Sequence, residues 1–400
     1  MNIPAHLILY SHDTFGLGHI RRNRKIAMAL VESFPGLRAS IITGSGLSGE
    51  YASHPRIDYI EIDQVDKLPD GQYCSATPGK SFAETIADRK RTILQFVQSN
   101  PADVFIADKE PLGLHGELID SLKHLKEAGT TLVLGLRDIL DEAETVRREW
   151  ERKGIFETID VYDHIWIYGT EEFYNPLANI GLPQSILDRC SYTGYLYQSR
   201  PEFENRPVVG LPEDYILVTA GGGGDGDFLM NAVLGAYESD KGVPLPAVLL
   251  LGPYTDQESD REIRARAHRI GNIRVIGFDS EPEALIRHAK AVIGMCGYNT
   301  FSEVITRNKR VLFVPRQAPR MEQLIRAQRA GNLNLCDTVL AKDAEDPDVF
   351  AAHINALIDS VGKLQAAHTL DATGLERICQ KVAAILDLQS RAELEVERAG

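Results

Sequence analysis

Short apolar runs of strand length alternate with longer helical patterns along the whole chain, and this alternation constrains the fold more than any other feature. In the first half, the apolar runs predict strands at residues 6–11, 39–43, 57–62, 103–107, 131–136, 164–168 and 191–193. Helical patterns fit between most of them, for example at residues 18–32, 81–98 and 114–127. Because these strands are apolar on both sides, they should form a parallel sheet that helices cover on both faces.

The same pattern starts again in the second half of the chain. Apolar runs there predict strands at residues 215–219, 247–251, 273–276, 291–293 and 311–314, with helices between them. The chain has 400 residues, which is more than one hydrophobic core usually serves. We therefore expect an α/β protein with two Rossmann-like domains.

Irregular sequence at residues 194–211, with prolines at positions 201 and 207, predicts the division between the domains. We expect an N-terminal domain at residues 1–200 and a C-terminal domain at residues 207–372. A last helix and a charged tail should occupy residues 373–400.

Two segments are expected to be irregular. The last helix should end near residue 388, and the tail at residues 391–400 should fray because it has mixed charges and few apolar residues. Residues 67–80 are polar and rich in turn formers, so they predict a long mobile loop.

Composition limits the class of protein and its location. The formal net charge of -14 argues against nucleic-acid binding, which needs a basic surface. The five cysteines are scattered without a CxxC spacing, which indicates neither a disulfide framework nor a zinc site. We expect no signal peptide, because the apolar run within residues 1–10 is too short for one, and no run reaches about 18 apolar residues. We expect a cytoplasmic protein, and peripheral association with the inner face of a membrane stays open.

The first candidate site follows the first predicted strand, in the sequence SHDTFGLGHIRR. Open parallel sheets bind ligands at the carboxyl ends of their strands. Gly16 and Gly18 would let the backbone approach a ligand at a helix N-terminus, and His19 or Asp13 would project into a cleft. A dinucleotide fingerprint would need glycine where the chain has Arg21. The alternative is a tight turn that polar residues cap.

Basic side chains follow at once in the same predicted helix. Three interpretations are open: a solvated helix face, a patch for a phosphorylated acceptor, or a contact with an anionic membrane surface. The basic residues are Arg21, Arg22, Arg24 and Lys25.

A run of glycines follows the first predicted strand of the second domain. It consists of Gly221, Gly222, Gly223 and Gly224. Because such a run costs conformational entropy, its backbone should lie close to another group, and we favour a pyrophosphate at the next helix N-terminus. Asp225 and Asp227 form a DxD pair, which we expect to cap the helix from Phe228 rather than to bind a divalent metal. A flexible turn between the domains is the simplest alternative.

Later in the second domain, an apolar strand runs into a glycine-containing turn and then into a helix. The turn would present backbone N–H groups and the positive end of the helix to a phosphate. Glu303, one turn inside the helix, would accept two hydrogen bonds from adjacent ribose hydroxyls. The turn consists of Gly297, Tyr298, Asn299 and Thr300.

Two more candidate segments flank this turn in the sequence. The loop that contains Phe278 would recognise the edge of a nucleobase, although Phe278 fits a core position equally well. Glu322 and Gln323 would bind sugar hydroxyls, whereas taken alone they would be a solvated helix start. Their order favours the functional interpretation, because each candidate segment follows a successive predicted strand.

At these residues the chain resembles the GT-B glycosyltransferases of family 28, the UDP-N-acetylglucosamine transferase type of peptidoglycan synthesis. The resemblance extends over both domains and is most specific at residues 221–323. It implies a GT-B fold, in which two Rossmann-like domains have parallel sheets that face each other across a cleft.

The resemblance also implies roles for individual residues. Glu303 would bind the ribose of a UDP-type donor, and Glu322 and Gln323 would bind the donor sugar. The diphosphate would meet two backbone segments, residues 297–300 and 222–224. The first-domain glycine loop, with His19, would face the acceptor.

Two turns depart from the family pattern. The sequence Cys-Gly-Tyr-Asn at residues 296–299 stands where the family usually has an Arg-Ala-Gly-Ala-like turn. The sequence Gly-Gly-Asp-Gly at residues 223–226 replaces a loop that contains Ser and Gln. The chain is therefore more similar to a predicted glycosyltransferase group than to the peptidoglycan enzyme, and the donor's sugar and base stay open.

The implied function is an inverting, metal-independent transfer of a hexose or N-acetylhexosamine from a nucleoside-diphosphate sugar to a hydroxyl acceptor. The acceptor would be lipid-linked or a saccharide, in glycolipid, cell-envelope or exopolysaccharide synthesis. His19, or as second choice Asp13, would deprotonate the acceptor. No cofactor is expected, because helix N-termini, with Arg316 or Arg320, would stabilise the departing diphosphate.

Three alternatives share the predicted fold. A sugar-nucleotide epimerase or a hydrolase would need the same donor site but no sugar acceptor. A non-enzymatic nucleotide-sensing protein would bind UDP without consuming a sugar donor.

Overall fold

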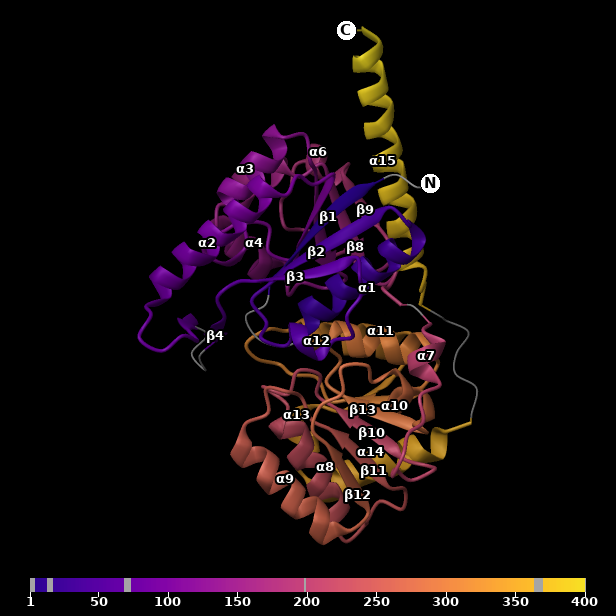
Figure 1. Cartoon of the computed structure of the whole chain (residues 1–400). Coiled ribbons are helices and arrows are strands. Elements are labelled where there is room, and N and C mark those ends of the chain that lie inside the picture. The colour runs from indigo at the N-terminus through magenta and orange to yellow at the C-terminus, as the bar shows by residue number, and fades with distance from the viewer. Residues whose placement is uncertain (1–3, 13–16, 68–72, 198, 363–369, 400) are drawn as a thin grey trace. The chain divides into compact units, whose positions relative to one another are not determined.

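The computed structural model describes residues 4–12, 17–67, 73–197, 199–362 and 370–399. The chain divides into two compact units. The first comprises Met1–Thr14, His19–Leu196 and Asp371–Gly400, and the second comprises Phe15–Gly18 and Tyr197–Leu370. Each unit contains a parallel sheet with helices around it (Figure 1).

A seven-stranded sheet forms the centre of the first unit, in the order β3-β2-β1-β6-β7-β8-β9. Each neighbouring pair of strands is parallel. The order reverses between β1 and β6, so their carboxyl ends lie side by side where an open sheet binds ligands. The strands are β1 (Ala5–Ser11), β2 (Leu37–Thr43), β3 (Ile57–Glu61), β6 (Val104–Asp108), β7 (Thr131–Arg137), β8 (His164–Tyr168) and β9 (Cys190–Tyr192).

Helices connect these strands and bury their apolar sides against the sheet. Helix α2 begins with a capping box in which Ser81 and Glu84 satisfy each other's backbone N–H groups. The apolar residues of the central strands are fully buried, among them Ile8, Phe105 and Leu134. The helices of this unit are α1 (Gly18–Ser33), α2 (Phe82–Ser99), α3 (Ile119–Glu127), α4 (Ala143–Arg152), α5 (Ile155–Thr158) and α6 (Gln184–Leu187).

The last helix, α15 (Gly374–Ala399), belongs to the first unit. The segment that leads into α15 forms backbone hydrogen bonds with the segment that follows β9. Tyr195 N donates to Asp371 O at 2.7 Å, and Gly374 N donates to Tyr195 O at 3.1 Å. Arg377 Nη1 donates to Thr193 O at 3.2 Å. The helix continues to Ala399, through most of the segment that was expected to fray.

Part of the segment predicted to be a mobile loop is a small hairpin. Strands β4 (Val65–Lys67) and β5 (Tyr73–Ser75) pair antiparallel. Residues 68–72 lie outside the described residues. Tyr73 stacks on Phe82 of α2 with ring centroids 6.2 Å apart, so aromatic packing holds β5 against helix α2.

The second unit has a six-stranded sheet in the order β12-β11-β10-β13-β14-β15. Its neighbouring strands are all parallel. The order reverses between β10 and β13, so this unit also has a point where ligands bind in open sheets. The strands are β10 (Ile216–Thr219), β11 (Ala247–Leu250), β12 (Ile273–Ile276), β13 (Ala291–Gly294), β14 (Arg310–Phe313) and β15 (Asp337–Thr338).

Local signals set the ends of the helices in this unit. Asp256 caps α9 through its side chain, and Gly271 ends the same helix in the left-handed conformation. Asp346 caps α14, which has proline in its first turn. The helices are α7 (Pro201–Glu204), α8 (Asp227–Glu238), α9 (Gln257–Ile270), α10 (Glu283–His288), α11 (Tyr298–Thr306), α12 (Glu322–Asn332), α13 (Ala341–Ala344) and α14 (Pro347–Ser360).

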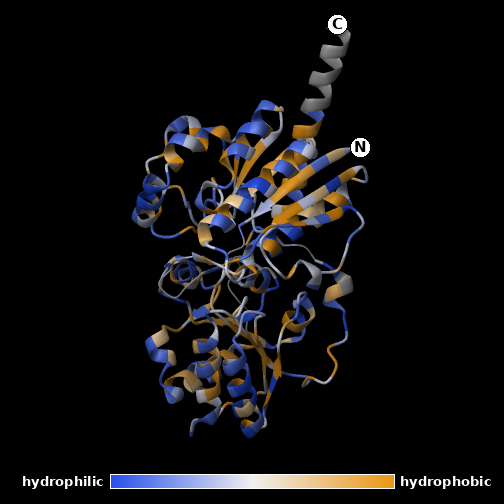
Figure 2. Cartoon of the chain, turned by 60° about the vertical axis from the view of Figure 1, so that its left-hand side comes forward, coloured by the Kyte–Doolittle hydropathy of each residue, from blue (hydrophilic) through white to orange (hydrophobic). Residues whose placement is uncertain are grey.

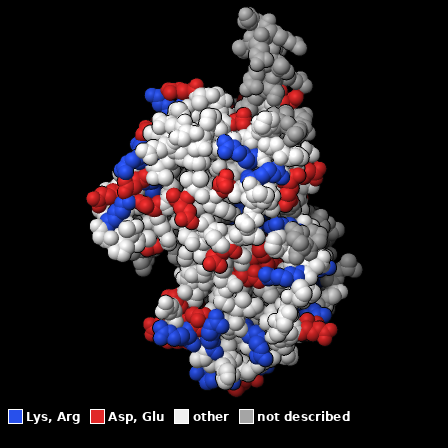
Figure 3. Space-filling model, in the orientation of Figure 1, with Lys and Arg blue, Asp and Glu red and all other residues white. Residues whose placement is uncertain are grey.

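Hydropathy follows the layers within each unit. Hydrophobic residues line the strands, whereas the helices carry mixed hydrophilic and hydrophobic faces (Figure 2). On the face shown in Figure 3, small groups of acidic and basic side chains alternate. No helix among the described residues combines the length and the apolar character needed to span a membrane.

Candidate functional site

A histidine and an aspartate meet at the carboxyl ends of β1 and β6 in the first unit. His19 lies in the first turn of α1, and its Nδ1 is 2.7 Å from Oδ2 of Asp108, the last residue of β6. The Asp108 side chain is 1% exposed and the His19 side chain 14%. An ionised carboxylate only accepts hydrogen bonds, so the Nδ1–H donates and Nε2 keeps its lone pair. The arrangement therefore leaves Nε2 of His19 able to accept a proton.

Arg22 joins this pair from the next turn of α1. Its Nη2 donates to Asp108 Oδ2 at 2.8 Å and lies 3.0 Å from His19 Nδ1. Burial alone would raise the pKa of Asp108, but the charges of Arg22 and His19 outweigh it and hold that pKa well below its usual range. Asp108 therefore stays ionised and continues to orient the His19 ring.

The His19 ring is neutral near pH 7. Burial lowers the pKa of His19 to about 4, although the nearby Asp108 carboxylate acts in the opposite direction. A neutral imidazole can accept a proton, which is the state that a general base needs before reaction.

A second histidine, which is buried, lies beside His19. His12 directly follows β1, and its ring meets the His19 ring edge-on with centroids 5.5 Å apart. Burial lowers the pKa of His12 well below its usual value. The carboxylate of Glu110 acts in the opposite direction and raises the pKa of His12. Glu110 is itself paired with Lys153 at 2.7 Å and with Lys109 at 3.2 Å. The His19–Asp108 pair thus has further polar and charged side chains around it, which a simple capped turn would not need.

The other residues predicted for the acceptor side differ in their placement. Asp13 and Gly16 lie outside the described residues. Gly18 is the first residue of α1, and Arg21 is half-buried. The solvated-face interpretation of the basic run is wrong for two of its members, because Arg22 is buried on Asp108 and Arg24 is buried over the ring of Tyr51, 5.1 Å from its centroid.

The sequence interpretation missed Asp108. The residue ends an apolar strand, and it contacts His19 only because β6 lies next to β1. The available signal was the run of charges Asp108-Lys109-Glu110 directly after a buried strand. Lys109 adopts a positive φ of 71°, which is uncommon outside glycine and typical of functional loops.

In the second unit, the expected phosphate turn lies between β13 and α11. Gly297 is the N-cap residue and offers no side-chain cap to the first N–H groups of α11. A Cβ at Gly297 would meet nothing within 4 Å. Cys296 has a φ of 65°, and its carbonyl accepts from Nη1 of the buried Arg326 at 2.9 Å. Helix α12 therefore fixes the shape of this turn.

Side chains of the first turns of α11 are largely buried. Tyr298 and Asn299 are buried and Thr300 is half-buried. The guanidinium of Arg326 lies 6.0 Å from the ring centroid of Tyr298, so the Tyr298 ring and Arg326 together stabilise the turn. Glu303, the residue expected to bind a ribose, is 2% exposed in this structure.

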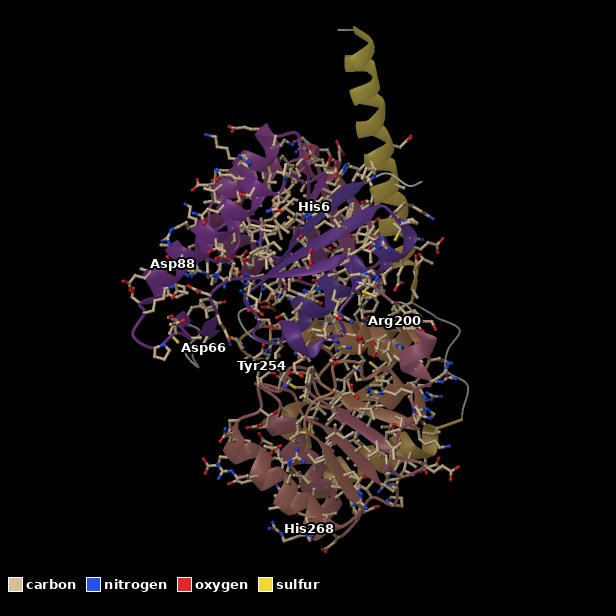
Figure 4. The ribbon with its side chains drawn as sticks, viewed as in Figure 1. His6, Asp66, Asp88, Arg200, Tyr254 and His268 are labelled. Carbon is tan, nitrogen blue, oxygen red and sulfur yellow. The ribbon has the colours of Figure 1, made fainter. Side chains whose placement is uncertain are left out.

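The glycine loop after β10 packs against the loop after β11. Tyr254 N donates to Gly222 O at 3.1 Å, and the label of Tyr254 in Figure 4 locates this contact in the second unit. A Cβ on Gly252 would lie 2.0 Å from the Gly222 backbone, and one on Gly223 would lie 2.6 Å from Gly252 Cα. The close neighbour that the glycine run requires is thus another loop, while Gly224 is exposed.

The two aspartates after this loop have different partners. Asp225 Oδ2 accepts from Arg316 Nη1 at 2.5 Å, and Asp227 Oδ2 accepts from Ser259 Oγ at 2.5 Å. Helix α8 begins at Asp227 with Gly226 as its N-cap, so the prediction that the aspartates cap a helix from Phe228 is wrong. Among the described residues, no group of three or more His, Cys, Asp or Glu side chains is placed to hold a metal ion.

Glu322 and Gln323 begin α12 and contact the loop after β14. Glu322 Oε1 accepts from Arg316 Nη2 at 2.7 Å, and Gln323 Oε1 accepts from the Arg316 backbone N at 3.0 Å. Both residues are buried, so they are not the solvated helix start that the sequence alone would suggest. Arg316 thereby links the glycine loop to the start of α12.

The expected base loop follows β12. Phe278 is half-buried rather than a core residue. Arg206 donates to Asp279 in the same loop, and Asp279 Oδ1 accepts from Glu281 N at 3.0 Å. The structure thus brings the glycine loop, the phosphate turn and the Glu-Gln pair to three adjacent strand ends, with the Phe278 loop at the edge strand β12 of the same sheet.

Comparisons with known proteins were made for the sequence and for the structure. No family model matches the sequence, and no curated protein matches it. Solved structures do match, and the three described below are glycosyltransferases. One is the glycotransferase of kitacinnamycin, with a TM-score of 0.57 and 14% identity over 99% of both chains.

Two further solved structures show the same likeness. MurG of Acinetobacter baumannii has a TM-score of 0.55 and 13% identity, over 95% of this chain and 100% of that one. UDP-glucose:anthocyanidin 3-O-glucosyltransferase, solved in complex with UDP, has a TM-score of 0.57 and 12% identity, over 97% of this chain and 100% of that one. At these identities the likeness shows the fold, so the predicted class of two Rossmann-like domains of the GT-B type is confirmed.

Proposed function

We propose that this chain is a glycosyltransferase that moves a sugar from a UDP-type nucleotide sugar to a hydroxyl acceptor. The observation that carries the proposal is the His19–Asp108 pair at the strand-order reversal of the first sheet. Support comes from the GT-B fold, which the chain has in common with glycosyltransferases such as the UDP-bound glucosyltransferase above.

The proposed chemistry is a single displacement at the anomeric carbon. His19 Nε2 takes the proton of the acceptor hydroxyl, and the oxygen attacks the anomeric carbon while the bond to the diphosphate oxygen breaks. The new bond forms on the face opposite the leaving group, so the configuration inverts. Asp108, held by Arg22, stabilises the imidazolium that forms.

The donor would occupy the strand ends of the second unit. The N-terminus of α11 and the backbone at residues 222–224 would accept the diphosphate, because helix N-termini attract anions. Glu322 and Gln323, which begin α12 and contact Arg316, would hold the donor sugar. Ribose binding by Glu303 would require its surroundings to open, since the side chain is now buried.

The finer assignment follows the resemblance to family 28. The acceptor would be lipid-linked or a saccharide, in glycolipid, cell-envelope or exopolysaccharide synthesis, and the sugar a hexose or N-acetylhexosamine. The protein would act in the cytoplasm or at the inner face of a membrane.

A two-stage experiment tests this function. A thermal-shift screen over nucleoside diphosphates and their sugars first finds the donor, because a ligand that binds the native state raises the melting temperature. Donor consumption is then followed with and without a panel of lipid-linked and saccharide acceptors. Glycosylated acceptor supports the proposal, free sugar or an altered sugar from donor alone indicates a hydrolase or epimerase, and binding without turnover indicates a sensor.

A further inference from the structure

A charged cluster lies across the end of β13 in the second unit. Arg316 follows β14, Asp225 follows β10, and these strands flank β13 in the sheet. The Arg316 guanidinium reaches Asp225 Oδ2 at 2.5 Å and Glu322 Oε1 at 2.7 Å. Since β13 leads directly into the turn at Gly297, the cluster adjoins the N-terminus of α11.

Arg316 is suited to bind an anion in this place. A guanidinium offers donors in a fixed planar fork, which matches two oxygens of a phosphate. Two of its nitrogens are held by carboxylates, and Nε is buried without a hydrogen-bond partner in the described part of the chain. With one positive and two negative side chains, the cluster would repel a further anion until one carboxylate leaves.

The two carboxylates differ in how easily they can leave. The Asp225 side chain is 33% exposed and sits between Gly224 and Gly226, whereas the Glu322 side chain is 6% exposed and fixed in the first turn of α12. Ion pairs that are exposed to solvent are weak, because water solvates the separated charges well. Asp225 is therefore the partner that an incoming anion replaces.

We propose that Arg316 binds the diphosphate of the donor and that Asp225 occupies Arg316 until the donor displaces it. The inference rests on the proposed function, because it takes a nucleoside-diphosphate sugar as the ligand of this unit. No covalent bond changes in the exchange: the Asp225 carboxylate turns to solvent and phosphate oxygens take its place on the guanidinium. Asp225 then acts as a specificity residue, because a ligand of low charge competes with it less well than a diphosphate.

Calorimetric titration with inorganic pyrophosphate and with UDP tests the exchange. Asp225→Asn should bind both ligands about 2- to 5-fold more tightly, because the competing carboxylate is gone. Arg316→Gln should bind both about 10- to 100-fold less tightly. The matched control is Asp260→Asn, which removes the same charge from a side chain that is 34% exposed and paired with Arg264 at 2.9 Å on α9 of this unit. The control should keep the affinity of the parent.

A tighter-binding variant cannot arise from misfolding, so Asp225→Asn decides the matter even if Arg316→Gln fails to fold. Unchanged or weaker pyrophosphate binding by Asp225→Asn would overturn the exchange, as would an equal gain in Asp260→Asn. Pyrophosphate carries neither base nor sugar, which separates the two proposals. Tighter pyrophosphate binding without any sugar transfer leaves the exchange standing and rejects the transferase, whereas sugar transfer with unchanged affinities does the reverse.

Discussion

The polar groups at the strand ends of the two units are held in different ways. In the first unit, Asp108 and Arg22 are buried and His19 is half-buried, and the three side chains contact each other at 2.7 to 3.0 Å. In the second, the Arg316 cluster has a solvent-accessible carboxylate and hydrogen bonds that an anion could replace. A proton-transfer group gains from fixed orientation, whereas a site that must admit and release a nucleotide gains from exchangeable contacts.

The sharpest way to break this comparison is to remove the base. His19→Ala should lower kcat by about 100- to 10,000-fold, because proton transfer from the acceptor loses its receiving group. The measurement is the initial rate of sugar transfer at saturating donor. His268→Ala, which alters an exposed histidine on α9 (Figure 4), is the control and should keep full activity. Turnover of His19→Ala within a few-fold of the parent would mean that another group is the base.

Removing the orienting carboxylate should have the next largest effect. Asp108→Asn should lower kcat by about 10- to 100-fold, since the His19 ring loses its fixed tautomer and the imidazolium loses its counter-charge. Asp120→Asn, an exposed change of the same kind on α3, is the control. If Asp108→Asn raises KM for the acceptor and leaves kcat unchanged, the carboxylate binds substrate instead of orienting the base.

Loop packing in the second unit gives a smaller effect on stability. Gly252→Ala should lower the free energy of unfolding by about 1–3 kcal/mol, because its Cβ would lie 2.0 Å from the Gly222 backbone. Gly297→Ala should change it by less than about 0.5 kcal/mol, because the space beside Gly297 is open. Denaturant unfolding measures both. Equal stability of the two variants would show that the glycine loop does not depend on its contact with Gly252.

The pH dependence should give the smallest change near neutrality. Burial lowers the pKa of His19 to about 4, and the base works only when it is unprotonated. The rate constant kcat/KM should therefore stay constant as the pH falls from 7 to about 5 and should decrease as the pH passes through about 4. A loss of activity centred near pH 6.5, the ordinary value for histidine, would show that the ring is less buried in the free enzyme.

Periodicity predicted the sheets well because buried parallel strands must be continuously apolar. The run at residues 273–276 coincides with β12, and that at residues 164–168 with β8. The hairpin strand β5 was missed because its three residues, Tyr73–Ser75, carry no periodic signal and depend on packing against α2.

The side-chain partners could not be predicted in the same way. His19 and Asp108 are 89 residues apart in sequence, and Asp225 and Arg316 are 91 apart. Only the strand order brings each pair together. Charged residues on a helix therefore look like a solvated face in the sequence, although the fold buries Arg22 on a carboxylate.

The return of α15 to the first unit decides how this protein can be dissected. Cutting the chain after Leu196 would give a fragment without the helix whose Leu375, Ile378 and Val382 are buried in that unit. The second unit is easier to express separately, since all of it except Phe15–Gly18 lies in the continuous stretch from Tyr197 to Leu370. To express the first unit alone, residues 371–400 would have to be kept, with a short linker that joins Leu196 to Asp371.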